Sequence, residues 1–120
     1  MIKEIEKPDI KFNFYNSVYD KYYYDDKNNE FFIIYFKSKY YFNLDGNYHR
    51  IGKPAIEFFN GGKIWEENGK MHRIDGPASY DHDNHKFWIN GKNYSKLVFA
   101  EKTNHLLCKN CNKFCKQKCF

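Results

Sequence analysis

The sequence predicts a mainly β protein: an antiparallel meander of stacked 23-residue β-hairpin repeats, with a short C-terminal helix and a Cys-rich tail. The first observation is an internal period. The rarest residues recur 23 positions apart, as Arg50 and Arg73 and as Trp65 and Trp88, and a fixed period of this length is typical of repeat architectures. The second is composition, because aromatic residues, which favour strands, make up 21% of the chain.

The N-terminal third carries strand patterns before the period begins. Ile10, Phe12 and Phe14 alternate with polar residues, which predicts a strand. The apolar run that follows indicates a second, more buried strand and its return. The elements expected in chain order are a loop, a strand, a turn and a return strand, at residues 20–30, 31–36, 37–39 and 40–44.

Two copies of the repeat follow. The first copy spans residues 45–67 and the second spans residues 68–89, while a third begins at residues 90–92 and stops there. In each copy one strand follows the proline, at residues 55–59 and 78–81, and a second carries the tryptophan, at residues 63–67 and 86–89. The turn between them is rich in residues that tolerate positive φ. Each copy is therefore expected to form a β-hairpin.

Projecting the period backward extends the repeat to residues 31–44. Phe42 then takes the position of Trp65, and Ile33 takes the position of Ile56. Residues 31–44 are thus interpreted as a degenerate half-copy that lacks the His-Arg segment. The whole hairpin domain is expected to occupy residues 1–93.

The character of the chain changes near residue 94. Ser95 is a good helix N-cap, and the residues after it favour a short helix over 96–107 that closes the open end of the hairpin stack. Residues 94–120 are therefore expected to form a helical cap followed by the Cys-rich tail.

The second copy, Asn-Gly-Lys-Met-His-Arg-Ile-Asp-Gly-Pro-Ala at residues 68–78, resembles a known repeat. It is similar to the MORN-like "NGKxHRxDGPA" β-hairpin repeats of giant DNA viruses and some phages, and the resemblance covers roughly residues 42–92. The first copy departs from it, with Gly52 in place of Asp75 and Lys53 in place of Gly76. The resemblance implies a non-catalytic interaction module of viral origin, in the host cytoplasm or the virion.

The repeated pairs His49-Arg50 and His72-Arg73 are the first candidate binding residues. Arginines at equivalent positions of stacked hairpins need compensation, either from carboxylates, carbonyls and aromatic faces within the fold or from a ligand. In the second case they would line a groove for phosphate or for a partner's carboxylates. Arg-to-Lys substitutions separate these hypotheses through their effects on folding and binding.

Trp65 and Trp88 are the second candidates. The simpler interpretation places them in the same core slot of successive hairpins, and the alternative is an exposed ladder that stacks bases or sugars. The second hairpin turn is rich in His and Asp, which indicates either solvated residues or a metal site. The His and Asp residues of this turn are Asp81, His82, Asp83 and His85.

The tail carries the strongest chemical signal, in four cysteines preceded by a histidine. These candidate metal ligands are His105, Cys108, Cys111, Cys115 and Cys119. Zinc takes four Cys or His ligands, often beginning with a C-x2-C pair. The spacing also suits one face of a helix, where the thiols would form a buried seam, and disulfides are the third alternative.

The primary hypothesis is a non-catalytic interaction or assembly module that binds a protein partner or associates with itself. No nucleophile–base arrangement, phosphate loop or paired-carboxylate motif is recognisable, so no enzymatic activity and no small-molecule substrate are expected. The net charge of +5 permits the alternative, a small nucleic-acid-binding protein with a zinc-ordered tail, without arguing for it. A weaker option is a virion component with oxidised cysteines. Neither a membrane span nor a secretory signal is expected.

Overall fold

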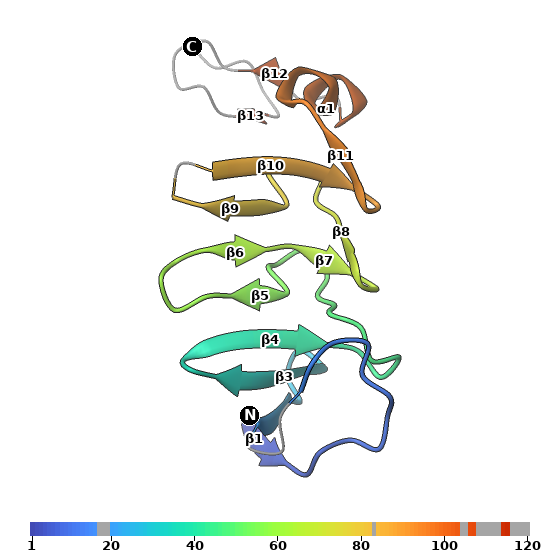
Figure 1. Ribbon diagram of the computed structural model, residues 1–120, viewed down its shortest axis with the longest axis vertical. Coiled ribbons are helices and arrows are strands. Elements are labelled where there is room, and N and C mark those ends of the chain that lie inside the picture. Colours follow the sequence, from blue (N-terminus) through green and yellow to red (C-terminus); the bar gives the residue numbers. More distant parts are fainter. Residues whose placement is uncertain (17–19, 83, 104–105, 108–113, 116–120) are drawn as a thin grey trace.

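The computed structural model describes residues 1–16, 20–82, 84–103, 106–107 and 114–115. It confirms the mainly β class, because in this part of the chain nine strands pair in one antiparallel sheet that rises hairpin by hairpin (Figure 1). In order across the sheet the strands are β1 (Ile2–Ile5), β2 (Lys21–Asp25), β3 (Glu30–Tyr35), β4 (Ser38–Phe42), β5 (Ile56–Glu57), β6 (Lys63–Ile64), β9 (Ser79–Asp81), β10 (Asn84–Ile89) and β11 (Lys92–Tyr94).

Two short ladders stand outside this sheet. One joins β7 (Glu66–Glu67) to β8 (Lys70–Met71) through an Asn-Gly turn, and it lies beside the hairpin stack (Figure 1). The other joins β12 (Leu106–Leu107) to β13 (Phe114–Cys115). Because β7 and β8 leave the main sheet, β6 pairs directly with β9.

The stack contains three hairpins, β3–β4, β5–β6 and β9–β10. The first is the segment expected to be a half-copy, and it forms a complete hairpin whose tight turn is at Phe36 and Lys37, both with positive φ. The expected turn at 37–39 is thus shifted by one residue. Ile33 pairs with Tyr40 as Ile56 pairs with Ile64, so Ile33 occupies the position expected for it.

The tryptophans do not occupy equivalent positions, contrary to the expectation of one shared slot. Ile56 pairs with Ile64, whereas Ser79 pairs with Lys86, so the second of these hairpins is one residue shorter. The residue after each pair is therefore Trp65 in one hairpin and Phe87 in the next, and both are buried. Trp88 lies one position further along.

The same position in the first hairpin belongs to Tyr41, not to Phe42 as the projected period implied. The amide of Tyr41 donates to the carbonyl of Ala55, as the amide of Trp65 donates to the carbonyl of Ala78, both at 2.7 Å. The equivalent aromatic residues of the three hairpins are thus Tyr41, Trp65 and Phe87. We call them the unit aromatics.

The N-terminal segment differs most from its prediction. Ile10, Phe12 and Phe14 form no strand and instead pack against the core cluster of Tyr22, Ile33 and Phe42. The segment is fixed by Asn13, whose amide donates to the carbonyl of Gly46 at 2.8 Å. Residues 20–30, expected to be a loop, contain β2, because its tyrosines pair across the sheet with the apolar β3.

Helix α1 (Lys96–Thr103) covers the C-terminal end of the stack, as expected, but ends before residue 107, since Leu106 is already extended. The hydroxyl of Ser95 accepts from the amide of Val98, which confirms the N-cap. Phe99 is fully buried, with its ring 4.9 Å from that of Phe87. The helix therefore covers the unit aromatic of the last hairpin.

Candidate functional site

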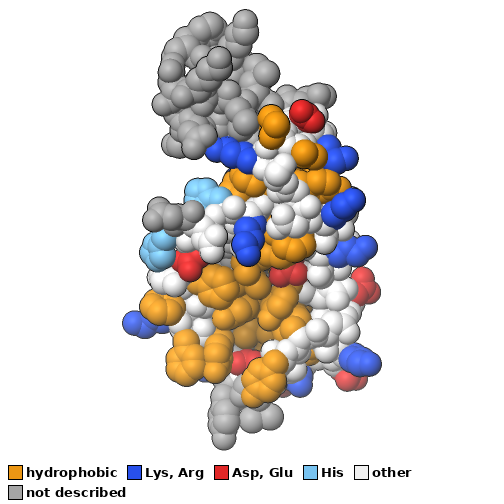
Figure 2. Space-filling model, turned by 45° about the horizontal axis from the view of Figure 1, so that its top comes forward, with side chains coloured by type: hydrophobic (Ala, Val, Ile, Leu, Met, Phe, Trp, Pro, Cys, Tyr) orange, Lys and Arg blue, Asp and Glu red, His pale blue; other side chains and the backbone are white. Residues whose placement is uncertain are grey.

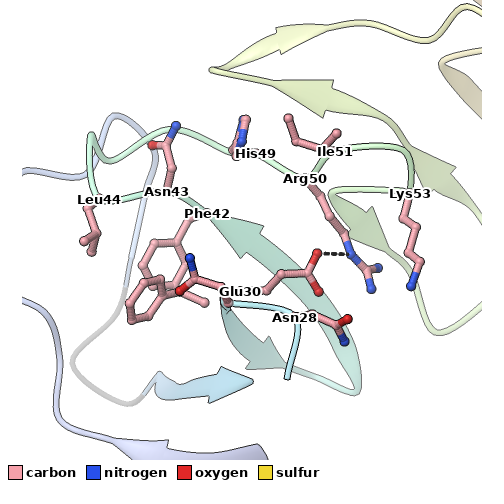
Figure 3. Close-up of a pocket in the computed structure, with 11 residues that line it drawn as sticks. Asn28, Glu30, Phe42, Asn43, Leu44, His49, Arg50, Ile51 and Lys53 are labelled. Carbon is pink, nitrogen blue, oxygen red and sulfur yellow. Dashed lines mark hydrogen bonds and ion pairs between the residues drawn. The ribbon is translucent and has the colours of Figure 1, made fainter. Parts of the chain in front are cut away.

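Arg50 lies between the first two hairpins and is held from several sides (Figure 3). Its guanidinium carbon sits 3.8 Å from the centre of the Tyr41 ring. Its Nε donates to Glu30 at 2.9 Å, and its Nη1 contacts Glu57 at 3.4 Å and the carbonyl of Pro54 at 3.3 Å. Only 10% of the Arg50 side chain is exposed. Since these partners would be left without a counter-charge or donor, removal of the Arg50 side chain is expected to destabilise the fold.

Arg73 repeats the arrangement one unit later. Its guanidinium carbon lies 3.8 Å from the centre of the Trp65 ring, and its Nη1 donates to the carbonyl of Pro77 at 3.1 Å. The carboxylate comes from Asp75, which accepts from Nε at 2.8 Å. Both units therefore share the contact between arginine and unit aromatic. The carboxylate that neutralises the arginine differs between them.

The departures of the first copy from the repeat now have a structural reason. Arg50 needs no acid at Gly52, because Glu30 and Glu57 from the adjacent strands neutralise it. A Cβ at Gly76 would lie 2.8 Å from the guanidinium carbon of Arg73. In the second copy the guanidinium of Arg73 lies over its own loop, so a side chain at position 76 would require this guanidinium to shift.

The two histidines also have structural roles. Nδ1 of His49 accepts from the backbone amide of Asn68 at 2.9 Å, and Nδ1 of His72 accepts from that of Asn90 at 3.0 Å. Both asparagines have positive φ and open Asn-Gly turns. Each histidine therefore satisfies an amide in the turn of the following unit, with Nε2 carrying the proton when the ring is neutral.

Two hollows of similar construction adjoin the arginines. The first, of about 520 Å³, is lined by Glu30, Phe42, His49, Arg50 and Lys53 among others (Figure 3). The second, of about 760 Å³, is lined by Trp65, His72 and Arg73 together with Lys102 of α1. In both hollows the guanidinium of the arginine already faces a carboxylate, and Lys53 in the first hollow and Lys102 in the second add a further cation.

Trp88 has a separate environment. Its carbonyl accepts from the amide of Arg73 at 3.1 Å, as the carbonyl of Glu66 accepts from the amide of Arg50 at 3.0 Å. Its indole Nε1 is buried and has no hydrogen-bond partner among the described residues. Trp65 is buried beneath Arg73, so the two indoles form no exposed ladder.

The candidate metal ligands of the tail fall largely outside the described residues. This applies to His105, Cys108, Cys111 and Cys119, whereas the backbone of Cys115 belongs to β13. Within the described ranges, no group of three or more His, Cys, Asp or Glu side chains is placed to hold a metal ion. In the second hairpin turn, His82 contacts Asp81 at 3.4 Å, while the Nε2 of His85 points to the carbonyl of His82.

Sequence reasoning missed the acids that neutralise Arg50 and the aromatic ring beneath it. Glu30 precedes the apolar run of β3, and Glu57 follows Ile56, so both stand at strand positions where a charge is unusual. A charged residue in an otherwise apolar strand is a signal for a buried partner, and in this chain the partner is the nearby arginine.

Comparisons with protein-family models, with curated proteins and with solved structures found no match to this chain. In the part of the chain that the structure describes, no helix is both long enough and apolar enough to cross a membrane.

Proposed function

We propose that the protein is a non-catalytic interaction module whose hairpin stack presents an aromatic surface to a protein partner. The surface, called the tip patch, consists of Tyr35, Phe36 and Phe59 at the tips of the first two hairpins. Their exposed fractions are 44%, 77% and 73%. Exposed hydrophobic patches and aromatic side chains are enriched at sites of protein contact.

The observation that carries the proposal is the backbone of Phe36, which has φ 45° in the tight turn of β3–β4. Asn or Gly would suit this conformation, whereas a bulky residue there is an outlier. The side chain gains no burial in return, because it stays 77% exposed. A strained residue that gives the fold little stability is best explained by a role outside the fold.

The tip patch is held together by hydrogen bonding between hairpins. The amide of Phe59 donates to the hydroxyl of Ser38 at 3.1 Å, which draws the second hairpin tip toward the first. The rings of Tyr35 and Phe36 meet at 4.4 Å with their planes at 65°. Figure 2 shows hydrophobic side chains gathered over the stack on the face that it presents. Aromatic side chains at adjacent hairpin tips suit a binding anchor.

The other repeated residues support an interaction module rather than a catalyst. The arginines, the histidines and the Pro-Ala carbonyls form hydrogen bonds within and between units. The repeated residues thus build a scaffold, whereas the residues at the hairpin tips differ from unit to unit. The resemblance to MORN-like viral repeats agrees with this division of roles, and we extend the proposal to a viral protein of the host cytoplasm or virion.

The test is site-specific photo-crosslinking in cells that produce the protein. A photoreactive phenylalanine at position 36 or 59 is expected to capture a discrete protein, and one at the exposed Asn93 is the matched control. Phe36→Asn removes the ring and relieves the turn, so it should abolish capture from position 59 without loss of stability. Unchanged capture in that variant, or equal capture from position 93, would contradict the proposal.

Sedimentation velocity over a range of concentrations distinguishes self-association from binding to a different protein. A second copy of the chain would give concentration-dependent dimers, and these dimers should be absent in Phe36→Asn. The nucleic-acid alternative depends on the net charge of +5 and on the tail. It predicts binding that falls steeply with added salt, because phosphate contacts release counterions.

A further inference from the structure

A second aromatic feature lies next to the tip patch, on the face covered by the N-terminal segment. It is a pocket of about 190 Å³ between that segment and strands β3 and β4. Its walls carry five aromatic rings and one carboxylate, from Phe14, Tyr15, Tyr35, Tyr40, Tyr48 and Asp20. Pockets for drug-sized ligands measure roughly 300–1,000 Å³, so this one suits a small group or the end of a side chain.

The deeper wall of the pocket is rigid. The rings of Phe14 and Tyr48 are stacked, with centres 4.1 Å apart and planes inclined by 10°. Tyr40 stands beside them, its ring centre 6.1 Å from that of Tyr48. Tyr15, which is 87% exposed, stands at the rim. The pocket therefore exists before any ligand arrives and needs little ordering on binding.

The described lining of the pocket contains one carboxylate, that of Asp20, and no basic side chain. Burial raises the pKa of Tyr48 to about 12, and nearby Tyr40, Glu66 and Asp20 contribute to the rise. Burial also raises the pKa of Tyr40, and Asp20 adds to that effect. Both phenols therefore stay neutral at physiological pH and offer π faces.

We propose that this pocket binds a trimethylammonium group, presented as a trimethyllysine side chain by the protein partner. Aromatic faces attract cations through the ring quadrupole, and quaternary ammonium groups are the ligands best matched to several rings around one site. Asp20 adds a carboxylate, which attracts a cationic group but gives no such attraction to a neutral apolar group. Tyr35 belongs to both the pocket and the tip patch, so a partner seated on the patch can reach the pocket.

The choice of a protein as the source rests on the proposed function, but the pocket itself can be tested without a partner. The probe is Nα-acetyl-trimethyllysine amide, titrated against the full chain by calorimetry and by the upfield shift of its N-methyl proton signal over the rings. Binding is expected to weaken at least about tenfold for unmethylated lysine amide and for an isostere with a tert-butyl group in place of trimethylammonium.

Two variants sharpen the test. Asp20→Asn removes the carboxylate at nearly constant shape and is expected to weaken binding about tenfold. Asp9→Asn is its control, because it removes the same charge from an exposed position of the same segment. Tyr15→Leu removes a rim ring from a largely exposed site, so it should weaken binding without unfolding the protein. Thermal unfolding of each variant verifies the fold.

Three results would overturn the proposal: no saturable binding of the trimethyllysine probe, equal binding of the tert-butyl isostere, or unchanged binding in Asp20→Asn. Tighter binding of choline than of the probe would overturn the assignment to a side chain. Failure of the proposed function is seen separately, since Phe36→Asn then leaves partner capture unchanged while the probe still binds the pocket.

Discussion

At the scale of single residues, the repeat motif is a set of mutual contacts between units. Histidine accepts from the Asn-Gly turn of the next unit, arginine stacks on the preceding unit aromatic, and the Pro carbonyl accepts from that arginine. Arg50 and Arg73 share this geometry but differ in environment. Arg50 has two carboxylate partners and is 10% exposed, whereas Arg73 has one and is 22% exposed.

This difference predicts unequal costs for the Arg-to-Lys substitutions. Lysine keeps the charge but cannot stack as a plane while donating to both a carboxylate and a carbonyl. Arg50→Lys is expected to lower the free energy of unfolding by roughly 1–3 kcal/mol, because Glu30 would lose a buried partner. Arg73→Lys should cost less. Urea unfolding checks both, with the exposed Lys92→Arg as control, and a larger loss for Arg73→Lys would contradict this account.

Glu66 gives a pH-dependent prediction. Burial raises its pKa above the ordinary 4.5, so its protonated form is favoured in the folded state. The stability it contributes is therefore full below pH 4.5 and is lost as the pH rises through the folded pKa. Glu66→Gln, which mimics the protonated form, should be more stable than the wild type at pH 7, with the difference vanishing below pH 4.5.

The measurement is the urea midpoint of both proteins across this range. The exposed Glu101→Gln variant serves as the control and should show no such trend. A constant difference between Glu66→Gln and wild type at all pH values would mean that burial of this carboxylate does not govern the effect.

At the scale of elements, the turns could be predicted and the docking of the N-terminal segment could not. Asn-Gly and Asp-Gly pairs fix turns through local backbone preference, and turns form at these sites. The alternation of Ile10, Phe12 and Phe14 has the period of a strand, yet the segment does not pair with the sheet, whose edge strand on this side is β1. Its apolar residues instead cover the core as an irregular segment.

Gly46 lies in a turn of the hairpin stack and contacts the N-terminal segment. Its substitution by alanine is therefore expected to cost more stability than the same substitution at Gly52. Both have positive φ, 83° and 73°, but a Cβ at Gly46 would overlap the carbonyl oxygen of Lys11, whereas at Gly52 it would meet nothing within 4 Å. Gly52→Ala should therefore cost only the conformational strain of about 1–2 kcal/mol. Gly46→Ala should cost more and detach the N-terminal segment.

Urea unfolding gives the two costs, and hydrogen exchange at Asn13 reports the detachment, because its amide donates to the Gly46 carbonyl. Equal costs for the two substitutions, with the Asn13 amide still protected, would show that the segment adapts to the added methyl group.

At the scale of the whole molecule, each hairpin unit contacts the units next to it, as expected for a repeat stack. Removal of one complete unit should therefore leave a folded protein. Deletion of residues 56–78 joins Ala55 to Ser79 and preserves the order of hairpin, turn and His-Arg segment. It should give the same β circular dichroism with a smaller free energy of unfolding.

The control is deletion of residues 56–77, which leaves one additional residue and shifts the register by one. A shift in register displaces the buried set of side chains, so this variant should lose cooperative unfolding. If both deletions fold equally well, the units do not behave as interchangeable modules.

The sequence by itself determined the period, the hairpin class, the turns at Asn-Gly and Asp-Gly pairs and the C-terminal cap, because these follow from local backbone preferences and from the spacing of rare residues. Only the tertiary structure decided which residues are equivalent and what they contact. The 23-residue spacing of the tryptophans suggested one slot, but the second hairpin is one residue shorter and places Phe87 there. Strand register depends on loop length and on non-local pairing, and the partners of Arg50 come from strands on either side, so neither can be read from a local pattern.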